Sequence, residues 1–205
     1  MFDPRSRLAS PSTRFSPAKI GARVPAPLRG FSPAKIPALL TILLALLGLF
    51  ILLVPRTLRV NVTPSVPLGL YRIVQVSAGR GSLVEICPPP GRLTSLGLQR
   101  GYIGHGPCPG KARPLLKEVL AVPGDRIVLT RMGIVRRGVL IPSSAPRTTD
   151  SEGRPLPHLR LGIWHVPPGS IWLYGPHPHS FDSRYFGPVA ADLIRNTLVP
   201  LSTTQ

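Results

Sequence analysis

The sequence predicts an all-β domain, built as a folded β-sheet or barrel-like assembly, preceded by one N-terminal transmembrane helix. Proline and glycine are abundant, with 27 and 20 residues among 205, and both interrupt long helices and favour turns. Short apolar and β-branched runs recur between those turns in the second part of the chain. One uncharged segment near the N-terminus is the exception, because it is long and apolar enough to form a helix. The length allows one ordinary domain with an appendage.

Residues 1–35 form a basic segment with seven Lys or Arg residues and a single acid, Asp3. It is rich in Pro, Ser, Arg and Ala, and the hexapeptide FSPAKI occurs at 15–20 and again at 31–36. Two short copies are too few for a repeat architecture. Because the segment has little to bury, we expect a disordered cytoplasmic tail. The formal charge of the whole chain, +17, favours nucleic acid or an anionic membrane surface as a partner, but its distribution matters more than its sum.

Residues 36–55 predict the transmembrane anchor. The run ALLTILLALLGLFILLV, residues 38–54, carries no charge and lies between Pro37 and Pro55. At about 1.5 Å per residue, a helix of this length is at the short end of what crosses a hydrocarbon core. The basic side is N-terminal, so residues 56–205 are expected outside the bacterial inner membrane, in the periplasm. A cleaved signal peptide is the main alternative, although no clear cleavage site follows; a buried core helix is disfavoured because the segment is apolar on all faces.

The rest of the chain, residues 56–205, predicts the periplasmic domain as short strands separated by turns. Two strands flank a Pro-rich turn at 63–69, a third follows, and residues 91–114 show no clear periodicity. Further strands are expected at 115–122, 126–130 and 133–141, and in the runs GIWHV and SIWLYG. The polar stretch 142–160 is expected to be an inserted loop or flap.

The first candidate for chemistry is Ser65, in the run TPSVPLGLY at 63–71. A proline lies close on either side, and proline fixes φ, so the hydroxyl is held on a stiff, exposed corner. A nucleophile needs such presentation. An ordinary turn serine is the commoner explanation of an isolated S-x-P, so this run alone does not establish a catalytic site.

The second candidate is Lys117, in the expected strand PLLKEVLAVPGD at 114–125. With the two-residue period of a strand, it is the only charge on a face of Leu, Val and Ala side chains. Its ammonium group can reach water from the edge of a sheet. Alternatively, burial lowers the pKa of the amine from about 10.4, so that it can serve as the general base for a serine hydroxyl.

The third candidate is the run HSFDSRYFGPV at 179–189. If the run is a strand, Asp182 and Arg184 share a face and can form a partly buried ion pair that holds the sheet together. Ser180 is placed to hydrogen-bond an amine and orient it.

A Ser-His-Asp triad is the alternative catalytic arrangement, because His177 and His179 lie close to Asp182 in the sequence. The chain has no G-x-S-x-G motif, however, and Pro178 separates the two histidines. We therefore favour a serine–lysine pair, which is a known variant of the triad.

The two cysteines, Cys87 and Cys108, can form a disulfide, because a compartment outside the inner membrane is oxidising. The bond would close a Gly/Pro-rich loop of about twenty residues and contribute roughly 3 kcal/mol. Two independent thiols are the alternative. The spacing fits no zinc motif and neither C-x-x-C nor H-E-x-x-H occurs, so we expect no metal and no cofactor.

The order of the motifs TPSVPLGLY, PLLKEVLAVPGDRI and SFDSRYFGPV, after one N-terminal apolar segment, resembles the signal peptidase I family. The patterns K-x-x-x-A-x-P-G-D and S-x-D-S-R-Y-F-G-x-V match its diagnostic boxes. The runs SVPLGLY, DSEGRPLP and HPHSFDSRYFGPV, with the paired cysteines before PLLK, are similar to the TraF branch, the peptidases of conjugative transfer systems. Departures from the housekeeping members, such as Glu118 after the lysine, bear on the choice of substrate.

The resemblance implies a β-rich fold that faces outward from the membrane and carries a Ser/Lys dyad. Four side chains are implied at the site by position: the nucleophile Ser65, the general base Lys117, the oxyanion-hole donor Thr63 and the lysine-orienting Ser180. Asp182 and Arg184 are implied as a structural pair near the site.

The expected function is maturation of a pilin-like or other exported precursor by a membrane-anchored serine endopeptidase, through an acyl-enzyme that water or the amino terminus of the substrate resolves. The expected partners are the propilin-like precursor, inner-membrane lipid and other proteins of the transfer apparatus, without a specific nucleic acid. One alternative is a general leader peptidase for secreted proteins. Another is a non-enzymatic, membrane-tethered component of the apparatus whose basic tail binds DNA or lipid.

Overall fold

The computed structural model describes residues 35–204, apart from the side chains of Lys35 and residues 53–56. The tail predicted at 1–35 therefore lies outside the described residues, except for Lys35 at the start of the first helix. The chain divides into two compact units, Met1–Ala45 and Leu46–Gln205.

The helix predicted near the N-terminus is α1, Lys35–Thr57. Its large apolar side chains from Ile36 to Leu52 are all exposed, with 51–64% of their surface accessible. The hydroxyl of Thr41, a polar residue within the apolar run, donates to the carbonyl of Pro37 at 2.6 Å and so adds no unpaired polar group. Among the described residues, no helix is both long and apolar enough to cross a membrane. The helix is confirmed, and its transmembrane position stays a prediction.

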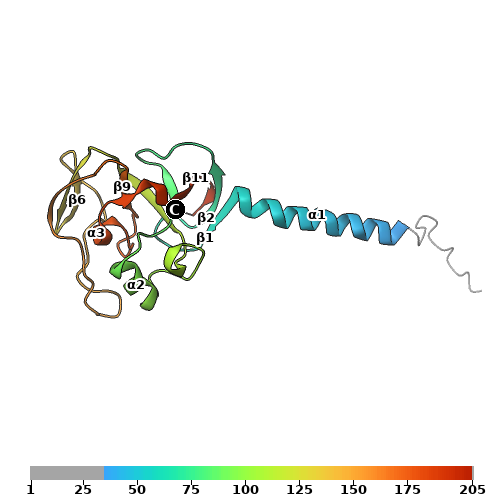
Figure 1. Ribbon diagram of the computed structural model, residues 1–205, viewed down its shortest axis with the longest axis horizontal. Coiled ribbons are helices and arrows are strands. Elements are labelled where there is room, and N and C mark those ends of the chain that lie inside the picture. Colours follow the sequence, from blue (N-terminus) through green and yellow to red (C-terminus); the bar gives the residue numbers. More distant parts are fainter. Residues whose placement is uncertain (1–34, 205) are drawn as a thin grey trace, which may run out of the picture. The chain divides into compact units, whose positions relative to one another are not determined.

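The described part of the larger unit contains eleven strands in two antiparallel sheets (Figure 1). The seven-stranded sheet has, in spatial order, β1 (Leu58–Asn61), β2 (Gly69–Val74), β11 (Ile194–Thr203), β3 (Leu83–Ile86), β4 (Leu115–Ala121), β9 (Ser170–Tyr174) and β10 (Val189–Ala190). The four-stranded sheet has β7 (Val139–Leu140), β6 (Gly133–Arg136), β5 (Arg126–Thr130) and β8 (Gly162–His165). The prediction of a mostly-β, folded-sheet domain is confirmed.

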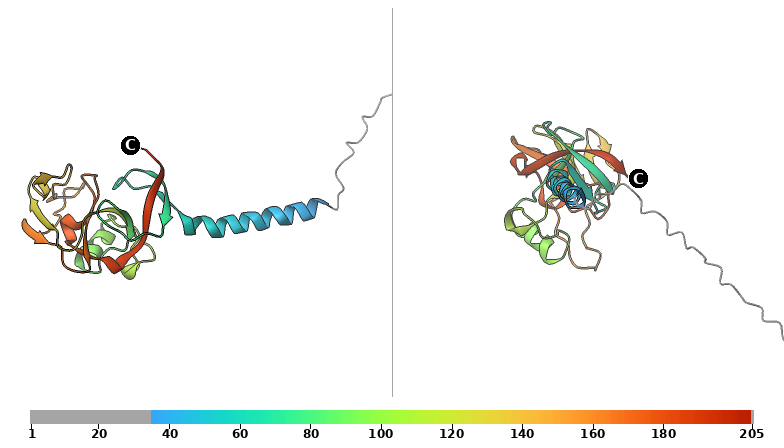
Figure 2. Two further views of the ribbon diagram at one scale, coloured as in Figure 1. Left: turned by 90° about the horizontal axis from the view of Figure 1, so that it is seen from above. Right: turned by 90° about the vertical axis from the view of Figure 1, so that its right-hand side faces the viewer.

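The long strand β11 lies between β2 and β3, so the C-terminal segment completes the middle of the larger sheet (Figure 2). Strand β4 lies in the same sheet between β3 and β9, so both of its backbone edges are paired. Buried apolar side chains pack around it, including Val84, Val119 and Leu173. This central place in the sheet is what makes a lysine on β4 unusual, because charged side chains are rarely buried without a partner.

Four short helical segments were not predicted: α2 (Arg92–Gln99), η1 (Pro109–Lys111), α3 (Ser183–Phe186) and η2 (Ala191–Leu193). They are too short to display a helical period in the sequence. The strand predicted at 133–141 is also divided, into β6 and β7, by a tight turn in which both Arg137 and Gly138 have positive φ. Such a turn fits the twist of the hairpin that it joins.

The segment 142–160 connects β7 and β8, the two edge strands of the four-stranded sheet, without a helix or strand of its own. It is held by Asp150. The buried Asp150 carboxylate accepts bonds from the backbone N–H groups of Glu152 and Arg154, from the Arg154 side chain and from the Tyr102 hydroxyl. These bonds outweigh burial and hold the pKa of Asp150 below its usual range. The flap is therefore fixed to the loop that carries Tyr102.

Cys87 and Cys108 form a disulfide with their Cα atoms 5.6 Å apart. The two cysteines belong to a buried cluster with Ile103, Phe181 and Tyr185, so the bond fixes the loop that carries α2 against the third sequence motif. No other cysteine exists in the chain.

Removing this disulfide by the double substitution Cys87→Ala and Cys108→Ala is expected to lower the free energy of unfolding by about 3 kcal/mol. The bond spans 21 residues, and the loss follows from the freedom that the unfolded loop regains. Equilibrium urea unfolding of the full chain in detergent, with and without the two substitutions, measures the difference. A loss below about 1 kcal/mol would show that the loop is ordered by packing alone.

Candidate active site

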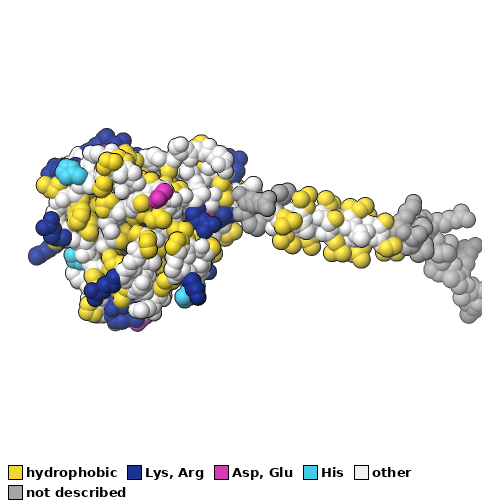
Figure 3. Space-filling view, viewed as in Figure 1, with side chains coloured by type: hydrophobic (Ala, Val, Ile, Leu, Met, Phe, Trp, Pro, Cys, Tyr) yellow, Lys and Arg dark blue, Asp and Glu magenta, His cyan; other side chains and the backbone are white. Residues whose placement is uncertain are grey.

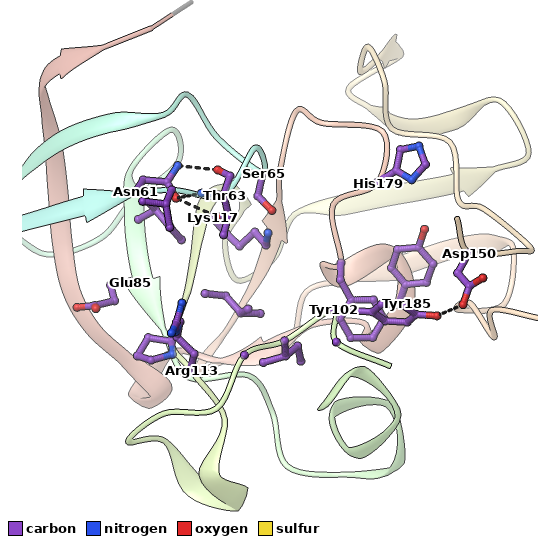
Figure 4. A pocket seen from close by; sticks show the side chains of 18 of the residues that line it. Asn61, Thr63, Ser65, Glu85, Tyr102, Arg113, Lys117, Asp150, His179 and Tyr185 are labelled. Atoms are coloured by element: carbon purple, nitrogen blue, oxygen red, sulfur yellow. Dashed lines mark hydrogen bonds between the residues drawn. The ribbon is translucent and has the colours of Figure 1, made fainter. Parts of the chain in front are cut away.

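A cavity of about 490 Å³ lies between the β1–β2 turn, the start of β4, the disulfide-bonded loop and the flap (Figure 4). The side chains that line it come from segments far apart in the sequence: Asn61, Thr63, Ser65, Tyr102, Arg113, Lys117, Asp150, His179 and Tyr185 are among them. The structure thus brings Ser65, Lys117 and Thr63 of the predicted site to one cavity.

Ser65 lies in the middle of the turn that joins β1 and β2. The ladder between these strands closes at the pair Asn61 and Gly69, so the residues between them form a loop beyond the sheet. Ser65 is half-buried, and among residues 35–204 its N–H donates to no backbone or side-chain acceptor. The nucleophile candidate therefore offers both a hydroxyl and a free N–H to a bound group.

Lys117 lies on β4 opposite Val84 of β3 and is only 2% exposed. Burial lowers the pKa of its amine to about 8; the negative charge of Asp182 opposes this shift, and the positive charge of Arg184 adds to it. Lowering the pKa to about 8 therefore makes the neutral amine accessible near physiological pH, although the ammonium form still predominates there. The sequence allowed either an ammonium group that reaches water from the sheet edge or a buried amine. The structure shows the buried amine.

The Lys117 side chain points toward Ser65, and both residues line the cavity (Figure 4). Within the described residues Lys117 makes no ion pair, although Asp182 contributes to its electrostatic environment. A hydroxyl next to an amine of lowered pKa is the arrangement that activates a serine nucleophile without a histidine.

Ser180 is linked to Ser65 by Gly175, whose backbone packs closely against both serines. Its hydroxyl is buried and has no hydrogen-bond partner among the described residues. A Cβ atom placed on Gly175 would lie 2.2 Å from the Ser180 Oγ and 2.8 Å from the Ser65 carbonyl oxygen, so the backbone of Gly175 is in close contact with both serines. A buried polar atom without a partner is uncommon and favours a functional role, here toward an amine or a substrate group.

Gly175→Ala is expected to reduce peptidase activity at least tenfold, because the new methyl group must displace Ser180 or the Ser65 backbone by more than small adjustments allow. Gly79→Ala is the matched control, since a Cβ atom there has no neighbour within 4 Å. Cleavage rates of the two variants, measured at equal folded concentration, test this. Full activity of Gly175→Ala would mean that the close packing of Gly175 against the two serines is dispensable.

The hydroxyl of Thr63, the predicted oxyanion-hole donor, is already hydrogen-bonded to another residue. Its Oγ1 lies 2.9 Å from Asn61 Oδ1, an oxygen that can only accept, so the hydroxyl proton of Thr63 is directed to Asn61. Its backbone N–H is bound to the same oxygen at 3.1 Å. The hydroxyl has to leave this acceptor before it can donate to a developing oxyanion.

Asp182 and Arg184 pair, but not on a strand as the sequence analysis expected. Asp182 is the N-cap of the short helix α3 and accepts a bond from the Arg184 N–H, which explains the local structure. Both side chains are 0% exposed, and Arg184 Nε donates to Asp182 Oδ1 at 2.8 Å. The expectation of a partly buried pair on one strand face is wrong, because the cap turns the chain into a helix.

The geometry disfavours the histidine triad. Both carboxylate oxygens of Asp182 are occupied, by Arg184 and by the Gly175 N–H, so Asp182 has no place for an imidazole. His179 lines the cavity, but Figure 4 shows it further from Ser65 than Lys117 is. Arg147 lies 3.5 Å from His179 Nε2, and burial together with this cation lowers the pKa of the imidazole.

A family model described as signal peptidase, peptidase S26, matches residues 33–201. The chain belongs to this family. The resemblance to the signal peptidases is confirmed, and the chain is a serine peptidase. The relatives that follow, all named TraF, confirm the TraF type.

Several curated proteins are similar over most of their length. The chain is 44% identical to a conjugal transfer protein TraF of Agrobacterium fabrum over 133 residues, which are 64% of this chain and 74% of that protein. It is 37% identical to a plasmid transfer protein TraF of Escherichia coli over 146 residues, 71% of this chain and 82% of that one. A solved signal peptidase I from Enterococcus faecalis is 16% identical, with a TM-score of 0.35 over 60% of this chain and 98% of that chain.

Three parts of the signal peptidase site were missed in the sequence. Asn61 lies at a strand end two residues before Thr63, and asparagine side chains commonly accept from the backbone N–H two residues later. Its contact with the turn could therefore have been predicted from the sequence. The role of Gly175 could not be predicted from the local sequence, because it depends on its close approach to Ser65, which is distant in the chain. The Tyr102–Asp150 contact joins two loops without periodicity and could not be found from local pattern.

Proposed function

We propose that this signal peptidase matures an exported, pilin-like precursor for conjugative transfer, with Ser65 as nucleophile and Lys117 as general base. The observation that carries the proposal is the buried Lys117, with a pKa lowered to about 8, ending beside the Ser65 turn in one cavity (Figure 4). The names of the similar TraF proteins, which refer to conjugal and plasmid transfer, support the biological setting.

The reaction would begin when neutral Lys117 takes the hydroxyl proton of Ser65 as the oxygen attacks the scissile carbonyl carbon. The free N–H of Ser65 supplies one donor to the oxyanion, and Thr63 supplies a second if its hydroxyl leaves Asn61. The Lys117 ammonium then returns the proton to the leaving amine as the C–N bond breaks. Water, or the amino terminus of the substrate, then attacks the acyl carbon and gives a proton to Lys117. As the ester bond to Ser65 breaks, the Lys117 ammonium returns this proton to Ser65 Oγ, and a linear or a cyclic product is released.

We also propose that residues 36–55 anchor the peptidase in the inner membrane, with residues 1–35 in the cytoplasm and residues 56–205 in the periplasm. The exposed apolar side chains of α1 and the disulfide support this location. On the face shown in Figure 3 the Lys and Arg side chains are scattered over the domain and do not gather in one patch, which favours lipid and protein partners over nucleic acid. Digestion of intact spheroplasts with an added protease tests the topology, because only a periplasmic domain is accessible.

The function is tested by incubating membranes that contain the full chain with a tagged pilin precursor from a conjugative system. The double variant Ser65→Ala, Lys117→Met is the inactive control, and an unrelated secreted precursor tests selectivity. Cleavage of the pilin precursor by the parent alone supports the proposal, and the product mass separates a linear product from a cyclic one that is lighter by one water. Cleavage of the unrelated precursor at the same rate would favour a general leader peptidase, and no cleavage of either would favour a non-enzymatic role.

A further inference from the structure

The side chain of Asn61 makes five hydrogen bonds to the turn that carries Ser65. Its Nδ2 lies within hydrogen-bond distance of the carbonyl oxygens of Thr63 at 2.8 Å, Val66 at 3.0 Å and Pro67 at 3.0 Å, so its two N–H groups are shared among three acceptors. Its Oδ1 accepts from the backbone N–H of Thr63 at 3.1 Å and from the Thr63 hydroxyl at 2.9 Å. Asn61 is 7% exposed, and its bond to the Val66 carbonyl is buried while the other four are part-buried.

The turn needs such a partner because the sheet cannot supply one. The β1–β2 ladder ends at Asn61 and Gly69, and the seven residues 62–68 lie beyond it. Apart from that of Leu68, which accepts from the Thr204 N–H, the carbonyl groups of this loop face no strand, and its two prolines cannot donate. The side-chain amide of Asn61 supplies both a donor and an acceptor to this loop. Its NH₂ group faces carbonyl oxygens, and its oxygen faces an N–H and an O–H, so only one orientation of the amide satisfies all of these groups.

These hydrogen bonds bind the backbone on both sides of Ser65, the candidate nucleophile. Ser65 lies between Thr63 and Val66, and the backbone on each side of it is tied to the same amide group. The Tyr71 hydroxyl adds a further bond to the Pro67 carbonyl. The position of the Ser65 backbone therefore depends mainly on the Asn61 side chain, and no acceptor among residues 35–204 binds the Ser65 N–H.

We infer that Asn61 is a positioning residue for the nucleophile: its side-chain amide holds the 63–67 turn in the shape that places Ser65 beside Lys117. The kinetic consequence rests on the proposed function, because it concerns precursor cleavage. The geometric consequence does not, because it concerns only the distance between position 65 and the lysine.

The geometric consequence can be measured on a thiol. Ser65→Cys introduces the only free thiol of the chain, since the two natural cysteines are paired. The nearby Lys117 ammonium favours the thiolate, so alkylation by iodoacetamide should titrate below about 8.5, the value of a free cysteine. Adding Asn61→Leu is expected to return this midpoint toward the free value by more than half of the shift. Adding Asn196→Leu, the same change on β11 away from the turn, is expected to leave it unchanged.

The kinetic consequence is measured in the chain with Ser65 intact. Asn61→Leu is expected to lower kcat for the precursor about 100-fold, with KM changed less than about threefold, because a displaced nucleophile affects chemistry more than binding. Asn61→Asp, which keeps the size and the acceptor oxygen but loses the donor group, decides the matter if the leucine variant does not fold.

An unchanged thiol midpoint and an unchanged kcat in a folded Asn61 variant would overturn the inference. A parent chain that cuts no precursor would instead overturn the proposed function, and the thiol measurement would still decide the role of Asn61. The two failures are therefore distinguishable.

Discussion

Ser65→Ala and Lys117→Met are each expected to lower kcat/KM for the precursor by about 10⁴-fold or more, and the double substitution is expected to cost no more than the larger single one. A nucleophile and its base act as one unit, so removing either leaves only the binding of substrate and the oxyanion contacts. Independent roles would instead give losses that multiply.

Methionine is the informative replacement for Lys117 because it has a similar length without the charge. Lys117 lies among apolar neighbours of β3 and β9, and burial disfavours its charged form. The methionine variant is therefore expected to unfold at the same urea concentration as the parent or a higher one. An inactive variant of undiminished stability excludes unfolding as the reason for the loss.

The pH dependence of the parent gives an independent test of the base. Lys117 acts as a base only when neutral, and its pKa is lowered to about 8, so kcat/KM should rise with pH and level off above about 8. The sign follows from the protonation state: below this pKa the ammonium form predominates and cannot accept the serine proton. A rise centred below about 6.5 would point to a histidine such as His179, whose pKa is lowered. Substantial cleavage by Lys117→Met would exclude the lysine altogether.

The strand that carries Lys117 could be predicted because its evidence is local. A two-residue period and the turn at Pro123 and Gly124 define β4, and the observed strand ends at Ala121, within one residue of the expected boundary. The same period placed the lysine on a buried face. The family motifs added what periodicity cannot give, namely that a serine far away in the sequence meets this lysine.

The run around Asp182 was misjudged for a physical reason. Alternating polar and aromatic residues in SFDSRYF suggest a strand, but an Asp whose side chain accepts from the N–H two residues later is a helix cap. Which of the two forms depends on burial of Arg184, a tertiary contact that the local sequence does not contain. The bond from Tyr102 to Asp150 is equally non-local, and so the anchoring of the flap could not be foreseen.

Breaking the Asp182–Arg184 pair on one side is expected to lower the free energy of unfolding by about 3–5 kcal/mol, because the remaining charge stays buried without its partner. Asp182→Asn and Arg184→Met are the two variants, and urea unfolding of the full chain is the measurement. The exposed Arg80–Asp125 pair is the matched control: its geometry is similarly close, but solvent screens it, so Arg80→Met should cost only a small part of that loss.

The pair should also affect catalysis, because Arg184 joins the two segments beside the site. Its guanidinium donates to the carbonyls of Ser143 and Ala145 in the flap and to that of Ser180 beside Gly175. Arg184→Met is thus expected to reduce activity even in conditions where the variant is fully folded. The double variant Asp182→Leu, Arg184→Met removes both charges, and it should be less destabilised than either single variant while still losing activity. If it instead regained full activity, the pair would serve stability alone, and the position of Ser180 would have to be fixed by the packing of α3.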